Sequence, residues 1–296
     1  FEELPAGAAS GRTRALLKIQ VGCVNFCSYC IIPYTRGREL SLPVDTAAKR
    51  AKELEDEGYK ELVITGIEIA SYGVDLPGKP NLADVVCAIA KAAPNMRLRL
   101  GSIEPTVITE DFCKKLVAAG TVCPHFHLSL QSGCDVTLKN MNRKYTTAQF
   151  TEIVERLRRY FPGCALTTDI IVGFPGETDA EFADGLRFLE ELPISYCHVF
   201  TYSKRPGTPA AAMKEQVPVV LKKERTNQLI ALSDRKKLAF YRDHIGESRP
   251  VLIEAEEKGS FMFGFTDNYI KLRLPFDATK VNTIENVDIQ EEKFSF

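Results

Sequence analysis

Apolar runs alternate with helical patterns over the first two thirds of the chain. Six short runs are apolar at almost every position, which is typical of strands buried on both faces of a sheet. Between these runs, apolar residues recur every three or four positions, as they do on one face of a helix. The six expected strands cover residues 14–21, 60–66, 96–102, 125–131, 164–173 and 195–202.

This order of strands and helices predicts an α/β fold with a parallel sheet covered by helices. Six units are fewer than the eight of a complete TIM barrel, so the pattern favours a partial, TIM-like (β/α)6 barrel. A single helical pattern then runs from about 217 to 245, and short β-rich segments split by Gly and Asn follow it. We therefore divide the chain into a partial barrel (1–216), a linking helix (217–245) and a small all-β barrel (246–296).

The composition is that of an ordinary globular protein. The 296 residues carry a net charge of −1, so no overall positive charge indicates a nucleic-acid partner. No apolar run approaches the roughly 20 residues that cross a membrane, and no signal segment precedes the first strand. The chain begins with Phe1 rather than Met, which suggests a longer protein. We expect a cytoplasmic monomer without a membrane anchor, whose nine cysteines stay reduced.

Three cysteines follow the first strand directly, with the spacing C-x3-C-x2-C. They are Cys23, Cys27 and Cys30, and no fourth cysteine lies nearby. Structural zinc needs four ligands, and the next Cys and the first His, Cys87 and His125, belong to separate elements. Three thiolates instead suit a [4Fe–4S] cluster whose fourth iron stays open for the amino and carboxylate groups of S-adenosylmethionine. Because loops at the carboxyl ends of barrel strands build active sites, we interpret the three cysteines as catalytic.

The residues around the cysteines resemble a known family. CSYCIIPYTRGRELS is similar to the corresponding segment of the radical S-adenosylmethionine methylthiotransferases. ELVITGIEIASYG, HFHLSLQSGCDVTLKNMNRKYT, TTDIIVGFPGET and HVFTYSKRPGTPAA resemble successive blocks of the branch that acts on N6-threonylcarbamoyladenosine in tRNA. The resemblance implies a radical barrel, a C-terminal RNA-binding barrel of the TRAM type, and a second [4Fe–4S] cluster on an N-terminal domain that this sequence lacks.

The same resemblance implies a reaction and partners. The enzyme would add a methylthio group to C2 of the modified adenosine at position 37 of tRNA, by means of a 5′-deoxyadenosyl radical. Its partners would be the anticodon stem-loop and an electron donor such as flavodoxin or ferredoxin. Two alternatives stay open. One is a methylthiotransferase branch that acts on isopentenyl-adenosine or on a ribosomal protein, and the other is a non-catalytic, metal-containing RNA-binding protein.

Further residues are expected around the cofactor, the first three of them by resemblance and the others because they lie at or after the ends of the expected strands. They are Tyr29, Gly66, Glu68, Ser102, Glu104, Gln131, Arg143 and Gly173. Gln131 and Arg143 would hold the ribose and the carboxylate, since the Arg fork matches a carboxylate, and Glu68 would meet the amino group. Four of these residues have a plainer alternative. Tyr29 could be core packing, Glu68 a solvated carboxylate, Arg143 a surface charge at a helix end, and Gly173 part of a tight turn.

The candidate tRNA surface is local. Residues 217–245 contain seven basic and three acidic residues, which is typical either of a phosphate track or of a solvated amphipathic helix. From residue 246 onward there are six basic and ten acidic residues, so the small barrel would need a local face to bind RNA. The candidates for the threonylcarbamoyl group and the tRNA are Arg36, Arg38, Arg205, Lys222, Lys223, Arg225, Arg235 and Lys236.

Overall fold

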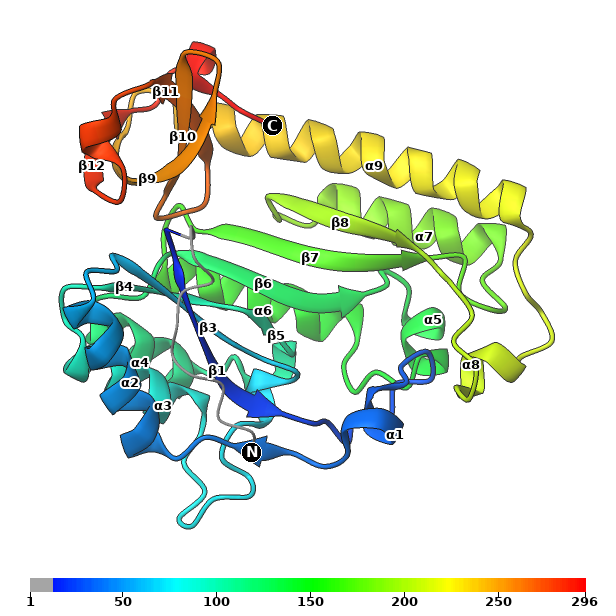
Figure 1. The fold of residues 1–296 in the computed structure, drawn as a ribbon. Coiled ribbons are helices and arrows are strands. Elements are labelled where there is room, and N and C mark those ends of the chain that lie inside the picture. The colour runs from blue at the N-terminus through cyan, green and yellow to red at the C-terminus, as the bar shows by residue number, and fades with distance from the viewer. Residues whose placement is uncertain (1–12) are drawn as a thin grey trace.

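The computed structural model describes residues 13–296, and the barrel strands lie where the sequence predicts them (Figure 1). Five of the six are continuous: β1 (Ala15–Val21), β3 (Glu61–Gly66), β6 (His125–Gln131), β7 (Ala165–Val172) and β8 (Tyr196–Thr201). The pairs β1–β3, β3–β4, β5–β6, β6–β7 and β7–β8 are parallel. The prediction of a partial α/β barrel is therefore confirmed.

The strand predicted at 96–102 is broken, and in this respect the prediction was wrong. It consists of β4 (Arg97–Leu100), which pairs with β3, and β5 (Ser102–Ile103), which pairs with β6. Gly101 lies between them and donates its N–H to the carbonyl of Ile64 at 2.8 Å. The barrel wall therefore consists of two four-stranded sheets, β2-β1-β3-β4 and β5-β6-β7-β8. The short strand β2 (Leu40–Ser41), which was not predicted, pairs antiparallel with β1.

Helices cover the outer face of this wall, as expected. The main ones are α2 (Val44–Asp56), α3 (Leu82–Ala92), α4 (Glu110–Ala119), α6 (Thr147–Tyr160) and α7 (Asp179–Glu191). Asn81, Thr146 and Thr178 form capping boxes at the starts of α3, α6 and α7, which fixes where these helices begin. Shorter elements lie in the loops: α1 (Ile32–Arg36), α5 (Asp135–Asn140), α8 (Pro209–Ala212), and the 3-10 turns η1 (Ile69–Ser71) and η2 (Pro105–Val107).

The long helix α9 (Val219–Arg242) does more than connect two parts of the chain. It runs along the outside of β8, the edge strand of the second sheet, beside α7 (Figure 1). Its Ser233 hydroxyl accepts from the N–H of Cys197 at 3.0 Å and donates to the carbonyl of the same residue at 2.7 Å. Leu229 and Leu232 join the barrel core. The helix therefore packs against the barrel wall. No helix within residues 13–296 is long and apolar enough to cross a membrane.

The C-terminal residues form a curled antiparallel sheet, which confirms the predicted small all-β unit. Its strands are β9 (Ser248–Lys258), β10 (Phe261–Thr266), β11 (Lys271–Pro275) and β12 (Ile284–Asp288), in the order β11-β10-β9-β12. The 3-10 turns η3 (Ala278–Lys280) and η4 (Glu291–Lys293) lie between and after them. Val251, Ile253, Met262 and Leu272 fill its core together with Tyr241 from the end of α9.

This sheet lies against the amino-terminal ends of the barrel strands, at the end opposite to the cysteine loop (Figure 1). Arg97 donates to the carbonyls of Pro250 at 3.1 Å and Phe265 at 3.0 Å, and Arg99 donates to that of Asp267 at 3.0 Å. Both guanidinium groups also contact the buried carboxylate of Glu61, at 2.5 Å and 2.8 Å. Burial alone would favour the neutral acid, but Arg99 and Arg97 outweigh it and lower the pKa of Glu61 to about 2.

Candidate active site

The cysteine loop leaves β1 through a glycine that the packing requires. Gly22 has φ +79°, and a Cβ atom there would lie 1.9 Å from the carbonyl oxygen of Arg38. The returning chain holds the loop from this side, because the N–H of Cys23 donates to the carbonyl of Gly37 at 3.0 Å and that of Val24 donates to the carboxylate of Glu39 at 3.0 Å. The start of the loop is thus fixed through its own backbone N–H groups.

The segment after α5 holds the other side of the loop. The side-chain amide of Asn142 donates to the carbonyls of Asn25 at 3.3 Å and Phe26 at 2.9 Å. The N–H of Ser28 donates to the carbonyl of Met141 at 3.0 Å. Asn142 has φ +61°, a left-handed conformation that asparagine tolerates well. The sequence did not predict this role of Asn142, because a contact between two distant loops leaves no local pattern. An asparagine at a turn was the only feature that pointed to it.

The three thiols of the loop lie in a partly buried, polar setting. Cys23 and Cys27 are buried and Cys30 is half-buried, and all nine cysteines of the chain are free. The Sγ atom of Cys23 accepts from the N–H of Asn25 at 3.4 Å, and that of Cys27 accepts from Arg143 at 3.3 Å. Burial raises the pKa of the Cys23 thiol to about 11 and also raises that of Cys30. Residues 13–296 contain no group of three or more His, Cys, Asp or Glu arranged to hold a single metal ion.

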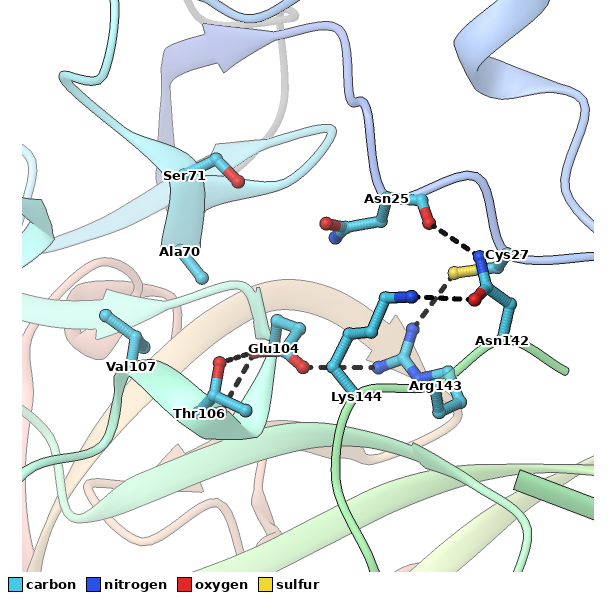
Figure 2. A pocket seen from close by; sticks show the side chains of 10 residues that line it. All are labelled: Asn25, Cys27, Ala70, Ser71, Glu104, Thr106, Val107, Asn142, Arg143 and Lys144. Carbon is cyan, nitrogen blue, oxygen red and sulfur yellow. Dashed lines mark hydrogen bonds and ion pairs between the residues drawn. The ribbon is translucent and has the colours of Figure 1, made fainter. Parts of the chain in front are cut away.

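Arg143 connects the cysteine loop to the strand ends, so it is not a surface charge at a helix end. Besides Cys27, its guanidinium donates to the carbonyl of Ser129 at 2.8 Å and to the hydroxyl of Tyr145 at 2.9 Å. It also lies 3.9 Å from the carboxylate of Glu104. These contacts fix the plane of the guanidinium group while it faces the pocket (Figure 2).

A pocket of about 270 Å³ opens between these loops (Figure 2). It is lined by Asn25, Cys27, Ala70, Ser71, Glu104, Thr106, Val107, Asn142, Arg143 and Lys144. These residues come from the segments that follow β1, β3, β5 and β6, all at the carboxyl ends of parallel strands. This is the end of a barrel at which such loops build an active site, as the sequence analysis expected.

The comparisons with known proteins agree with this arrangement. The family model described as the radical SAM superfamily matches residues 17–189, which is more than half of the chain. The chain belongs to the radical SAM superfamily. Membership implies a [4Fe–4S] cluster and S-adenosylmethionine as cofactors.

Curated relatives place this radical SAM protein in the methylthiotransferase family. It is 40% identical to the threonylcarbamoyladenosine tRNA methylthiotransferase MtaB of Bacillus subtilis, over 100% of this chain and 66% of that protein. The MtaB of Chlamydia pneumoniae is 37% identical over 97% of this chain and 68% of that protein. The tRNA-2-methylthio-N(6)-dimethylallyladenosine synthase of Desulfitobacterium hafniense is 36% identical over 96% of this chain and 64% of that protein. The chain thus spans about two thirds of the length of these relatives.

Solved structures support the fold of the radical SAM protein. Coproporphyrinogen III oxidase (HemN) of Escherichia coli aligns with a TM-score of 0.56 at 14% identity, over 92% of this chain and 69% of that chain. The radical S-adenosylmethionine methyltransferase TsrM of Kitasatospora setae aligns with a TM-score of 0.56 at 19% identity, over 67% of this chain and 38% of that chain. At these identities the likeness concerns the fold alone.

Within the radical SAM site, the predicted cofactor residues divide into two groups. Glu104 and Arg143 line the pocket beside Cys27. Glu68 lies close by, because the amide of Asn25 is 3.4 Å from its carboxylate. Burial, followed by the negative charge of Glu104, raises the pKa of Glu68 to about 7. Glu68 is therefore a mostly buried carboxyl group at the site and not a solvated loop carboxylate.

The other predicted cofactor residues lie outside the pocket lining. Gln131 ends β6 with φ +76°, which is uncommon for a residue with a side chain, and Ser102 is exposed on β5. Tyr29 packs against a cluster that contains Phe174 and Tyr202. Close packing explains the glycines at two of the predicted positions. A Cβ on Gly66 would lie 2.7 Å from the carbonyl of Gln20, and a Cβ on Gly173 would lie 2.4 Å from the Lys222 side chain.

The candidate tRNA residues differ in exposure. Arg36, Arg38, Arg205, Lys223 and Arg235 are exposed. Lys236 donates to the carbonyls of Glu190 and Leu192 at the end of α7, both at 2.8 Å. Lys222 is buried and donates to the carbonyl of Tyr202. Arg225 is also buried and pairs with Glu177 and Asp179, both at 2.6 Å. We therefore leave Lys222, Arg225 and Lys236 out of the tRNA surface proposed below.

Proposed function

We propose that this chain is the catalytic part of an enzyme that adds a methylthio group to C2 of N6-threonylcarbamoyladenosine at position 37 of tRNA. The observation that carries the proposal is a single loop with three thiols beside a polar pocket, at the carboxyl end of a radical SAM barrel. The 40% identity to a threonylcarbamoyladenosine tRNA methylthiotransferase supports the choice of substrate.

The donor set of the loop fits the cofactors that the superfamily implies. Cys23, Cys27 and Cys30 are three soft ligands on one loop, and they would bind three irons of a [4Fe–4S] cluster and leave the fourth open. When bound, the reduced cluster and S-adenosylmethionine supply the radical chemistry that replaces a C–H bond by a C–S–CH3 group. Arg143, which already donates to Cys27, would stabilise the negative charge of that ligand.

The charged groups of the pocket suit the two ends of an amino acid. The guanidinium of Arg143 would donate to the carboxylate of S-adenosylmethionine, and Glu68 or Glu104 would accept from its amino group. Ser129 and Tyr145 hold Arg143 in place through the contacts described above. In this way the chain orients the cofactor without using the buried ion pairs at the other end of the barrel.

The substrate and partners follow from the proposed reaction. The anticodon stem-loop would contact the exposed basic residues near the site, Arg36, Arg38 and Arg205, and along α9, Lys223 and Arg235. An electron donor such as flavodoxin or ferredoxin would reduce the cluster. We further propose a second [4Fe–4S] cluster outside these residues as the source of sulfur, and a cytoplasmic monomer as the working form.

A second substrate is proposed as an alternative to the first. Relatives named tRNA-2-methylthio-N(6)-dimethylallyladenosine synthase are 36–38% identical, which is close to the figures for the MtaB proteins. Such an enzyme would modify the same ring atom of an adenosine with an apolar N6 group. The chemistry at the cysteine loop would be the same for both substrates. Side chains of the barrel wall must therefore determine which N6 group is accepted.

The proposed function is tested by nucleoside analysis of tRNA. The gene that encodes the full protein is deleted, and tRNA hydrolysates are compared by mass spectrometry before and after complementation. We expect loss of the methylthio form of threonylcarbamoyladenosine and its return with the wild-type gene. The choice of substrate would be contradicted if the deletion strain kept the methylthio form of threonylcarbamoyladenosine and lost the methylthio form of dimethylallyladenosine. Loss of neither would contradict the proposed reaction.

A further inference from the structure

A polar cluster lies on the inner face of the second sheet, apart from the cysteine loop. His127 on β6 has its Nδ1 atom 2.8 Å from the hydroxyl of Thr167 and its Nε2 atom 3.2 Å from the carboxylate of Asp169, both on β7. The ring of His198 on β8 is centred 5.4 Å from that of His127, and the ring of Tyr196 meets His198 edge-on at 5.5 Å. Three neighbouring strands therefore bring two imidazoles and one carboxylate together.

Strand alternation sets the direction in which this cluster faces. Successive side chains of a strand point to opposite faces of the sheet. Leu128, Ile170 and Cys197, which directly follow or precede members of the cluster, belong to the core beneath the helices. His127, Asp169 and His198 therefore face the lumen of the barrel. His198 is exposed there, and 25% of the side-chain surface of Asp169 is exposed to solvent.

The cluster lies directly below the candidate active site. Ser129 is two residues beyond His127 on β6, and its carbonyl accepts from Arg143, which also donates to Cys27. A parallel strand rises about 3.3 Å per residue, so the cluster lies about 7 Å below the level of Ser129. An N6 substituent several atoms long can span this distance from a base that is held at the cysteine loop.

The chemistry of the cluster is that of hydrogen bonding. The part of the chain from residue 13 onward has no group of three His, Cys, Asp or Glu side chains suited to a metal ion, which sets this cluster apart from a metal centre. Although part of its surface is exposed, desolvation of the His198 ring by its surroundings, followed by the neighbouring His127, lowers the pKa of His198, which favours the neutral ring. A neutral imidazole has one N–H donor and one acceptor nitrogen. An apolar ligand would leave these groups without partners, at a cost in affinity.

We propose that His198, positioned beside the His127–Asp169 pair, selects a hydrogen-bonding N6 substituent on the substrate adenosine. The inference rests on the proposed function and deepens it. C2 and N6 lie on the same edge of adenine, so a base that presents C2 for reaction also presents its N6 substituent to the lumen wall. The threonylcarbamoyl group offers a urea, a hydroxyl and a carboxylate to His198, whereas a dimethylallyl group offers no polar atom.

Phe200 provides a matched contrast on the same strand. It lies two residues beyond His198, so it shares the lumen face, and it is 53% exposed. A flat, exposed aromatic ring is suited to stack on a base whatever its substituent. We assign stacking on the base to Phe200 and recognition of the N6 substituent to His198.

The test uses three anticodon stem-loops that differ only in the N6 group of one adenosine: threonylcarbamoyl, dimethylallyl or hydrogen. Their dissociation constants are measured by fluorescence anisotropy, without oxygen, for the full-length protein with its clusters. We expect the wild type to prefer the threonylcarbamoyl stem-loop over the dimethylallyl one by about tenfold or more. His198→Phe should lower this preference by about tenfold, and His198→Gln, which keeps a donor and an acceptor, by less than about threefold. Phe200→Ala should weaken all three complexes by a similar factor.

The outcomes separate this inference from the proposed function. Equal binding of the dimethylallyl and threonylcarbamoyl stem-loops by the wild type overturns the inference. So does a His198→Phe variant that keeps the wild-type preference. A methylthio product on one of the stem-loops would still uphold the proposed reaction in those cases. If no stem-loop yields a methylthio product, it is the proposed function that fails. Thermal unfolding of each variant shows that the changes in preference arise in folded protein.

Discussion

The two ends of the barrel use similar side chains in different ways. At the amino-terminal end, Glu61 is fully buried between Arg97 and Arg99, and the C-terminal sheet covers all three. At the carboxyl end, Glu68 and Glu104 share the neighbourhood of a single guanidinium, and that group lines an open pocket. Carboxylates matched by cations stabilise the fold. Two carboxyl groups that share one guanidinium at an open pocket are arranged to receive a cationic group of a ligand.

The pKa values express this difference directly. The two guanidinium groups lower the pKa of Glu61 to about 2, although burial opposes them. Burial and Glu104 raise the pKa of Glu68 to about 7. Perturbed carboxyl groups in a cleft are typical of functional sites, whereas a saturated ion pair is typical of structure. Variants that change one end of the barrel at a time test this difference.

The largest effect is expected at the cysteine loop. Cys27→Ala removes one of three iron ligands and one acceptor of Arg143, so the iron and sulfide of this loop should be lost and cleavage of S-adenosylmethionine should fall below detection. Iron and sulfide analysis, with 5′-deoxyadenosine measured by chromatography, checks both. The control is Cys87→Ala, a half-buried cysteine on α3 that should retain both properties. Turnover that survives in Cys27→Ala would refute the assignment.

The next effect concerns stability at the opposite end. Glu61→Gln leaves Arg97 and Arg99 buried without their carboxylate, and breaking a buried pair of this kind costs about 3 to 5 kcal/mol. Glu104→Gln should change the free energy of unfolding by less than about 1 kcal/mol, because its ion pair with Arg143 is long, at 3.9 Å. Urea denaturation of both variants provides the measurement.

Activity should rank the same two variants in the reverse order. Glu104→Gln should lower cofactor cleavage by about tenfold or more, whereas folded Glu61→Gln should cleave at a nearly normal rate. Equal losses of stability in the two variants, or a normal rate in Glu104→Gln, would remove the distinction between the two ends of the barrel.

A third prediction concerns pH and has opposite signs at the two ends. A folded-state pKa of about 7 means that Glu68 binds its proton more tightly in the folded protein, so stability should fall as pH rises from about 4.5 to 7. For Glu61, with a pKa of about 2, the stabilisation is present above about pH 4.5 and is lost as pH falls towards 2. In iron-free protein, Glu68→Gln should remove about 1 to 3 kcal/mol of the decline between pH 4.5 and 7. An unchanged slope in that window would show that Glu68 titrates normally.

The smallest effect is expected on the surface of α9. Lys223 is exposed, whereas Lys222 beside it is buried against Tyr202. Lys223→Ala should weaken stem-loop binding a few-fold and reduce the slope of log K against log salt by about 1. Lys222→Met should leave that slope unchanged. A salt slope that responds to Lys222 and not to Lys223 would place the RNA on a different face.

Local patterns were sufficient to predict much of this molecule. The barrel strands follow from apolar runs, and Cys23, Cys27 and Cys30 follow from spacing after a strand, because both signals lie within a few residues. The break at Gly101 depends on pairing with two different neighbours, which no local pattern contains.

Burial of long basic side chains was equally beyond the sequence. Lys222 and Arg225 fit the pattern of a basic helix face, but their partners Tyr202 and Glu177 come from other strand ends. The role of Asn142 in holding the cysteine loop likewise depends on contacts across more than a hundred residues. Sites were predicted where one segment supplies the chemistry, and missed where the fold assembles it.

The central claim is an iron–sulfur cluster with one open iron on the cysteine loop, and its most direct test is electron paramagnetic resonance. The protein is purified and reduced without oxygen, and spectra are recorded with and without S-adenosylmethionine, beside Cys27→Ala. The account predicts a [4Fe–4S] signal that changes when S-adenosylmethionine is added, whereas the spectrum of the variant does not respond to S-adenosylmethionine. A site filled by a single zinc ion, silent in the spectrum and indifferent to S-adenosylmethionine, would contradict it.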